Sequence, residues 1–314
     1  MFFELMLVAF IAVAVLLITA VPGYVMLKKK MLSEDCISGF SKVLLFVCQP
    51  CLAVYTFKSA EFSVEILKNI GIFALLSILI MVIMLSCAYL VLRKKCKDPV
   101  YRIMTIATSF ANCAFFGIPV IEALMPQEQA AGMMIYTTVF AVVMNVAGWT
   151  LGSAIISQNP KHMSAKKIFL NPAMIGTLVA LAIFCFEIPI QSDLNNMITI
   201  LGKMCSPLSM IIMGMRLSTM KLLPMFTDLR IYLTVAVKQI VMPALAFLMV
   251  YFLPLPYEMK AAFFMVCACP AASIVLNFAE IVGEGQKEAA NTVLLSTMLS
   301  IVTMPPMMML LNLL

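Results

Sequence analysis

Apolar runs close to the length of a membrane-crossing helix recur along the whole chain of 314 residues. A helix needs about 20 mostly apolar residues to cross a bilayer. Hydrophobic residues make up 63% of the sequence and charged residues only 11%, whereas a soluble domain carries about 25% charged residues. This composition excludes an ordinary soluble globular protein. It predicts an all-α integral membrane protein, because a helix satisfies its own backbone polar groups in lipid.

The apolar runs and the charged interruptions between them predict ten transmembrane helices. The loops that join these helices are short, so no soluble domain is expected. The ten spans are predicted near residues 5–27, 37–57, 69–92, 101–124, 129–157, 168–187, 196–217, 229–253, 258–282 and 287–312.

The basic residues fall mainly on one side of these predicted spans. Fifteen lie at the loops after spans one, three, five, seven and nine, and three lie on the other side. Cytoplasmic loops carry the excess of Lys and Arg, which predicts a multi-pass protein of the cell (plasma) membrane with both termini extracellular. The net charge of +6 is therefore a topology signal, and lipid rather than nucleic acid is the expected surrounding partner. The fifteen are Lys28, Lys29, Lys30, Arg93, Lys94, Lys95, Lys97, Arg102, Lys161, Lys166, Lys167, Arg216, Lys221, Arg230 and Lys287, and the three are Lys58, Lys68 and Lys260.

Two segments 158 residues apart carry matching interruptions of an apolar helix. The first runs from Asn112 to Glu122, and the second runs from Pro270 to Glu280. A proline inside a helix leaves a backbone carbonyl without its partner, which lipid cannot satisfy. Such breaks persist where they line a polar cavity, and paired breaks in corresponding halves indicate the binding site of a secondary transporter.

The same offset suggests an internal repeat. With five spans per half, residues 158–314 start on the opposite side of the membrane from residues 1–157. Pro50 in span two matches Pro207 in span seven at a nearly identical offset. We therefore predict two inverted five-helix repeats within one membrane domain, 1–157 and 158–314.

At these motifs the chain resembles the auxin efflux carrier family of the bile/arsenite/riboflavin transporter superfamily. That family includes bacterial putative malate and malonate permeases and the plant PIN-type auxin exporters. The resemblance covers essentially all ten spans. The residues that carry it are Asn112 to Leu124 with Gly117-Ile118-Pro119 and Glu122-Ala123-Leu124, Pro270 to Glu280 with Phe278-Ala279-Glu280, Ala289, Leu295-Ser296-Thr297 and Met304-Pro305.

The resemblance implies a fold in which spans four and nine are broken and cross near the membrane centre. It also implies an elevator mechanism, a scaffold of spans one, two, six and seven, and a homodimer through that scaffold. Many relatives carry a polar residue closer behind the span-nine proline, where this chain has Ile274 and Val275. The second crossover is therefore expected either at Pro270 or nearer Asn277.

The predicted breaks have a chemistry suited to anions. Pro119 cannot donate a hydrogen bond to the carbonyl of Phe115, and Gly117 loosens the helix just before it. Each break creates a half-helix whose N-terminus carries free N–H groups and partial positive charge. Two such ends would make an anion site without a cationic side chain. A proline kink packed against its neighbours is the alternative.

Polar side chains inside the spans complete the candidate site. Asn112 and Asn277 would add amide groups, and Asn145 in span five is either substrate-facing, as the resemblance implies, or an interhelical contact. Lys238 lies deep in span eight and has either a role in substrate attraction or coupling, or a structural pairing with a carbonyl. Gln49 and Gln239 are weaker candidates. The predicted substrate-binding residues are Asn112, Gly117, Ile118, Pro119, Asn145, Pro270, Asn277 and Lys238.

Glu122 and Glu280 are candidates for coupling to H⁺ or Na⁺, with solvated helix ends as the simpler interpretation. No metal site or cofactor is predicted, because the single histidine, His162, lies in a loop and no set of ligands accompanies the cysteines. An enzyme is disfavoured, since no Asp lies inside any span. The leading hypothesis is a secondary membrane transporter (permease) for a small organic anion such as a carboxylate. A sodium-coupled carrier similar to the bile-acid symporters and a transport-inactive membrane sensor are the alternatives.

Overall fold

The computed structural model describes residues 2–158, 170–220 and 222–314, and within them it is helical apart from turns and one isolated β-bridge. The prediction of an all-α chain is confirmed for these residues. The predicted start of span six at residue 168, the basic residues Lys161, Lys166, Lys167 and Lys221, and His162 lie outside the described residues.

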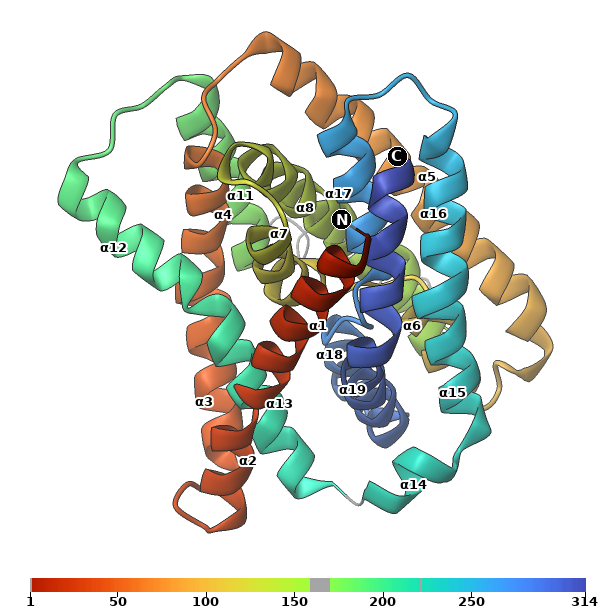
Figure 1. Ribbon diagram of the computed structural model, residues 1–314. Helices are drawn as coiled ribbons and strands as arrows, with labels where there is room; N and C mark the ends of the chain where they lie inside the picture. Colours follow the sequence, from red (N-terminus) through yellow and green to blue (C-terminus); the bar gives the residue numbers. More distant parts are fainter. Residues whose placement is uncertain (1, 159–169, 221) are drawn as a thin grey trace.

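Within each described range the helices follow one another with short connections (Figure 1). In the first half they are α1 (Phe2–Ile18), α2 (Val21–Lys28), α3 (Asp35–Val43), η1 (Leu44–Cys48), α4 (Gln49–Lys58), α5 (Val64–Leu92), η2 (Arg93–Lys95), α6 (Pro99–Ala107), η3 (Cys113–Gly117), α7 (Ile118–Leu124), α8 (Gln127–Ala147), η4 (Gly148–Gly152) and α9 (Ser153–Ser157). In the second half they are α11 (Pro172–Cys185), α12 (Ser192–Lys203), α13 (Cys205–Thr219), α14 (Leu222–Thr227), α15 (Leu229–Ala236), η6 (Val237–Val241), α16 (Met242–Tyr251), α17 (Tyr257–Ala268), α18 (Ile274–Val282), α19 (Gln286–Met308) and η7 (Met309–Leu313).

Seven helices of the described residues are long and apolar enough to cross a membrane. Two further apolar helices, Cys113–Leu124 and Pro172–Cys185, are shorter. The first of these belongs to the interrupted segment that the sequence predicted as span four. The arrangement as ten spans in two inverted repeats stays a prediction.

Several helices begin directly after a polar side chain that caps the first turn. Ser63 accepts a hydrogen bond from the backbone N–H of Ile66 at the start of α5, and Asp98 accepts one from Val100 at the start of α6. Asn171 caps α11 in the same way. Asp98 and Asn171 are each followed by proline, whose fixed φ suits the first helical position. The polar residue therefore determines where each apolar run starts to coil.

Three prolines within the spans are accommodated by π-helical turns. Pro50, Pro119 and Pro243 each lie two residues beyond such a turn, η1, η3 and η6. At η3 the N–H of Ile118 donates to the carbonyl of Cys113, five residues earlier. The wider turn makes room for the pyrrolidine ring and for the carbonyl to which the proline cannot donate a hydrogen bond. These helices therefore continue past their prolines.

The two chain ends lie at the same end of the bundle (Figure 1). Helix α1 packs against α19 and also contacts η7, the short helix that follows α19. Helices α2 and α13 pack closely through Gly23 and Gly214, which face the backbone of the opposite helix. The N-terminal span is therefore joined both to the C-terminal helix and to the first part of the second half.

Candidate anion-binding cavity at two crossing helix breaks

The two interrupted segments meet through their backbones. The N–H of Asn112 donates to the carbonyl of Pro270 at 2.7 Å, and the N–H of Ala272 donates to that of Phe110 at 3.0 Å. Between these bonds, Ala111 pairs with Ala271 as an isolated antiparallel bridge. Each break thus satisfies polar groups that the other leaves open, which apolar surroundings would not do.

The first break lies earlier in the chain than the prolines suggested. Helix α6 ends at Ala107, and the helix that contains Pro119 already begins at Cys113. The prediction that the backbone opens at Gly117–Pro119 is therefore wrong, because the π-turn η3 absorbs the proline. In the second half the break does lie at Pro270, between α17 and α18.

Beside the crossing lies a cavity of about 450 Å³. Its walls come from both breaks, from α8 with the adjoining turn η4, from the start of α11, and from η1 with the start of α4. The lining residues are Leu45, Phe46, Gln49, Ala111, Asn112, Cys113, Ala114, Phe115, Ala141, Met144, Asn145, Trp149, Leu170, Asn171, Pro172, Ala272, Ser273, Ile274 and Asn277. We refer to it as the crossover cavity.

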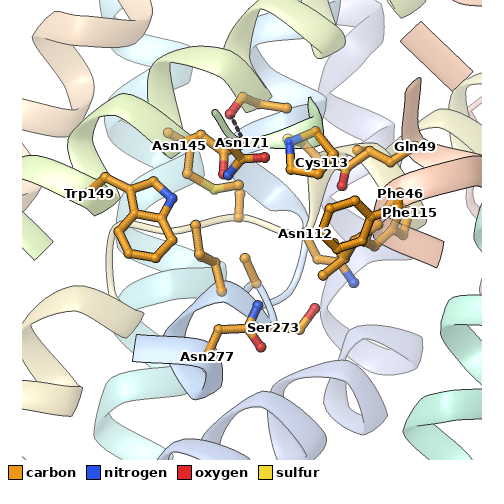
Figure 2. A pocket seen from close by; sticks show the side chains of 18 of the residues that line it. Phe46, Gln49, Asn112, Cys113, Phe115, Asn145, Trp149, Asn171, Ser273 and Asn277 are labelled. Atoms are coloured by element: carbon orange, nitrogen blue, oxygen red, sulfur yellow. Dashed lines mark hydrogen bonds between the residues drawn. The ribbon is translucent and has the colours of Figure 1, made fainter. Parts of the chain in front are cut away.

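The structure brings together three asparagines that the sequence singled out separately. Asn112, Asn145 and Asn277 all line the crossover cavity, and Figure 2 shows them around its open centre. Asn171 and Ser273 also line the cavity, but the sequence did not predict them as site residues. The signal for Asn171 was its position before a proline at a helix start. That pattern predicts a cap and gives no indication of a cavity.

These polar side chains keep hydrogen-bonding capacity for a ligand. The amide of Asn145 uses one N–H on the carbonyl of Ala141 at 2.9 Å. The carbonyl oxygen of Asn171 accepts from the N–H of Ala173 at 2.9 Å, which leaves its NH₂ group uncommitted by that bond. The side-chain oxygen of Gln49 is buried without a hydrogen-bond partner. An unsatisfied buried amide of this kind is costly unless a ligand or water completes it.

The wall of the crossover cavity carries helix ends and no charged side chain. None of its lining residues is an Asp, Glu, Lys or Arg. The helix Cys113–Leu124 and α18 both begin at its wall, after Asn112 and Ser273 respectively. Free N–H groups and partial positive charge at helix N-termini favour anions.

The model of a protein family described as membrane transport protein matches residues 8–308 of the chain. The chain belongs to this family. This is the auxin efflux carrier family that the two motifs resemble, so the resemblance is confirmed. A search of curated proteins found none similar to the chain. Family members are transporters rather than enzymes, and together with its apolar helices the match makes the chain a multi-pass membrane transporter.

Five residues predicted to bind substrate do not line the crossover cavity of this transporter. Gly117 instead packs against the second break, since a Cβ at that position would lie 3.0 Å from Sγ of Cys269. The cation of Lys238 is fully buried and donates to backbone carbonyls. Of the two interpretations of Lys238, the structure therefore shows the pairing of its ammonium group with backbone carbonyls. The five residues are Gly117, Ile118, Pro119, Pro270 and Lys238.

The two coupling candidates of the transporter also lie away from the cavity. Glu122 accepts a hydrogen bond from the hydroxyl of Tyr55 at 2.7 Å. Glu280 forms an ion pair with Arg216 at 2.8 Å, and both side chains are partly exposed. Coupling through either carboxylate stays a prediction. Among the described residues, no group of three or more His, Cys, Asp or Glu side chains is placed to hold a metal ion.

Proposed function

We propose that this transporter is a secondary carrier for a small organic anion, such as a carboxylate, and that it binds the anion in the crossover cavity. The observation that carries the proposal is the convergence of Asn112, Asn145 and Asn277 on one cavity without charged side chains. Two of them come from the interrupted segments, where helix N-termini add partial positive charge. Amide N–H groups and helix ends together suit a carboxylate.

The remaining surface of the crossover cavity suits an apolar body. Phe46, Phe115, Met144 and Trp149 line it alongside the amides. A volume of about 450 Å³ falls within the range of about 300–1,000 Å³ for small-molecule sites. A ligand with one anionic end and a short hydrocarbon frame would use both kinds of surface.

We further propose an elevator movement and a homodimer, both of which the family resemblance implies. The packing is compatible with two groups of helices. Helix α13 packs closely on α2, and α4 packs on α11 and α12, whereas α8 packs on α5 and α17. The first group contains parts of spans one, two, six and seven, the expected scaffold, while α1 of span one packs on α19 and α7.

A substrate screen of the purified protein tests the proposed function. Malonate, malate and acetate would be added in thermal-shift and electrogenic-current measurements, with and without sodium and with a pH step. We expect at least one carboxylate to raise the melting temperature and to drive a current in proteoliposomes. A strict sodium requirement would favour a carrier similar to the bile-acid symporters. Binding without transport would favour the sensor, and no response to any carboxylate would contradict the proposal.

The location of the termini is part of the proposal. If both termini are extracellular, single cysteines that replace Lys95 and Gln191 should lie on opposite sides of the cell membrane. An impermeant thiol reagent should label the Gln191→Cys variant in intact cells and the Lys95→Cys variant only after the membrane is opened. The parent protein, with its ten native cysteines, gives the background. Labelling of both variants from outside would contradict this topology.

A further inference from the structure

A buried cation lies directly behind the second break. Lys238 belongs to the π-turn η6, and its side chain has 0% exposure. Its Nζ donates to the carbonyl of Cys267 at 2.8 Å and to that of Cys269 at 2.7 Å. These carbonyls stand at the C-terminal end of α17, where the helix stops and the chain turns toward the crossing. Hydrogen bonds from an ammonium group are stronger than neutral ones, and a cation is favourable at a helix C-terminus.

Two neighbouring side chains hold the same stretch of backbone. Oγ of Ser296 on α19 accepts from the N–H of Ala271 at 2.8 Å. The amide of Gln239 in turn donates to the backbone carbonyl of Ser296 at 2.8 Å. Lys238, Gln239 and Ser296 are all buried, and we call them the α17 clamp. The clamp holds both the carbonyls and an amide N–H of the break, and none of its three residues lines the cavity.

The position in the first half that corresponds to Lys238 is not a cation. The residue 158 positions before Lys238 is Ile80 on α5, which is also fully buried. Among the described residues, none of the ion pairs includes Lys238. The partners of its charge that the described residues supply are the carbonyl dipoles of Cys267 and Cys269. A charge in surroundings of low dielectric acts over a longer distance than it would in water.

We infer that Lys238 is a positioning residue that holds the second break from behind and gives the crossover cavity the positive potential by which it selects anions. The inference rests on the proposed function in naming an anion as the substrate. The physical reason is that Lys238 offsets the partial negative charge of the α17 C-terminus, which lies four residues before Ala272 at the cavity wall. The neighbouring helix N-termini then determine the sign of the potential.

The potential can be measured without a substrate. Ser273 lines the cavity, and in a Ser273→Cys protein the introduced thiol would be labelled with an anionic sulfonatoethyl or a cationic trimethylammonioethyl methanethiosulfonate. Mass spectrometry of the peptide that contains this position separates it from the native thiols. The readout is the ratio of the anionic to the cationic reaction rate. We expect this ratio to be higher in the folded protein than in the protein unfolded in guanidinium chloride.

Lys238→Met in this background should lower the ratio at least about fivefold, because it removes one positive charge near the thiol. Lys238→Arg, which keeps the charge, should retain most of the ratio. Ile80→Met is the matched control, because it introduces the same side chain at the buried position of the first half that corresponds to Lys238. Ser296→Ala disturbs the clamp without removing charge, so it should alter both rates by a similar factor and leave the ratio unchanged.

Two results would overturn the inference. One is an unchanged ratio in a folded Lys238→Met protein, and the other is a drop in Ser296→Ala equal to that in Lys238→Met. If Lys238→Met does not fold, the comparison of the folded and unfolded parent decides, and equal ratios there would reject a positive cavity. A substrate screen that finds no carboxylate would reject the proposed function alone, because the labelling ratio does not depend on any substrate.

Discussion

Gly214→Ala is expected to destabilise the transporter strongly. The new Cβ would collide with the backbone carbonyl of Ala20 and would lie 3.0 Å from the backbone nitrogen of Tyr24. Both contacts are to backbone, so no side-chain rotation relieves them. Small residues let membrane helices approach closely, and their loss removes the packing that joins the helices. Overpacking costs about 1–3 kcal/mol, and more where nothing yields, so we expect a loss of about 3 kcal/mol.

The measurement is thermal and denaturant unfolding of the purified protein in detergent. Gly23→Ala should behave similarly, because its Cβ would meet the backbone of Ile211 from the other side of the same contact. Gly39→Ala and Gly71→Ala are the matched controls, since no atom lies within 4 Å of the added carbon at either position. Alanine is favoured over glycine in a helix, so these two should retain or gain stability. Equal stability of all four variants would contradict the close α2–α13 contact.

Asn112→Ala and Asn277→Ala are each expected to weaken carboxylate binding at least about tenfold. A hydrogen bond to a charged group contributes about 1.5–3 kcal/mol. Both side chains line the crossover cavity, while the crossing uses the backbone N–H of Asn112 and not its amide. The fold should therefore survive, with little change in melting temperature.

Affinity from thermal shift or currents, measured with the carboxylate that gives the largest response, tests this expectation. Asn196→Ala is the control, because it removes an exposed amide from α12, away from the cavity. Unchanged affinity in both cavity variants would exclude these amides from the site. If the melting temperature without ligand falls far enough to explain the weaker binding, the two amides have a structural role instead.

The comparison of sequence and structure is clearest at the prolines. Pro119 and Pro270 each lack the N–H that a helix interior needs, yet of the two Pro270 alone lies in an open break. The π-turn before Pro119 forms because the surrounding helices leave space for a wider turn. The local sequence does not show which proline lies in a continuous helix and which lies in a break. The first break instead lies at Ser109–Asn112, which contains the buried Phe110 and no proline.

Lys238 illustrates a second limit of sequence reasoning. Its depth in an apolar run indicated a buried cation with a function or a structural partner. Whether the ammonium group faced the substrate or the backbone depended on the rotation of its helix and on the position of α17. The structure places both carbonyl acceptors within hydrogen-bond distance of Nζ, and Lys238 does not line the cavity.

Local chemistry determined the all-helical membrane character, the helix starts at Ser63, Asp98 and Asn171, and the family. Apolar runs, capping side chains and motif spacing are properties of contiguous residues, so they can be read along the chain. Tertiary structure decided which backbone groups the two breaks exchange, and that Asn112, Asn145 and Asn277 share a cavity with Gln49 and Asn171. These pairings join residues far apart in the chain, and they depend on helix rotation and close packing, which no local pattern specifies.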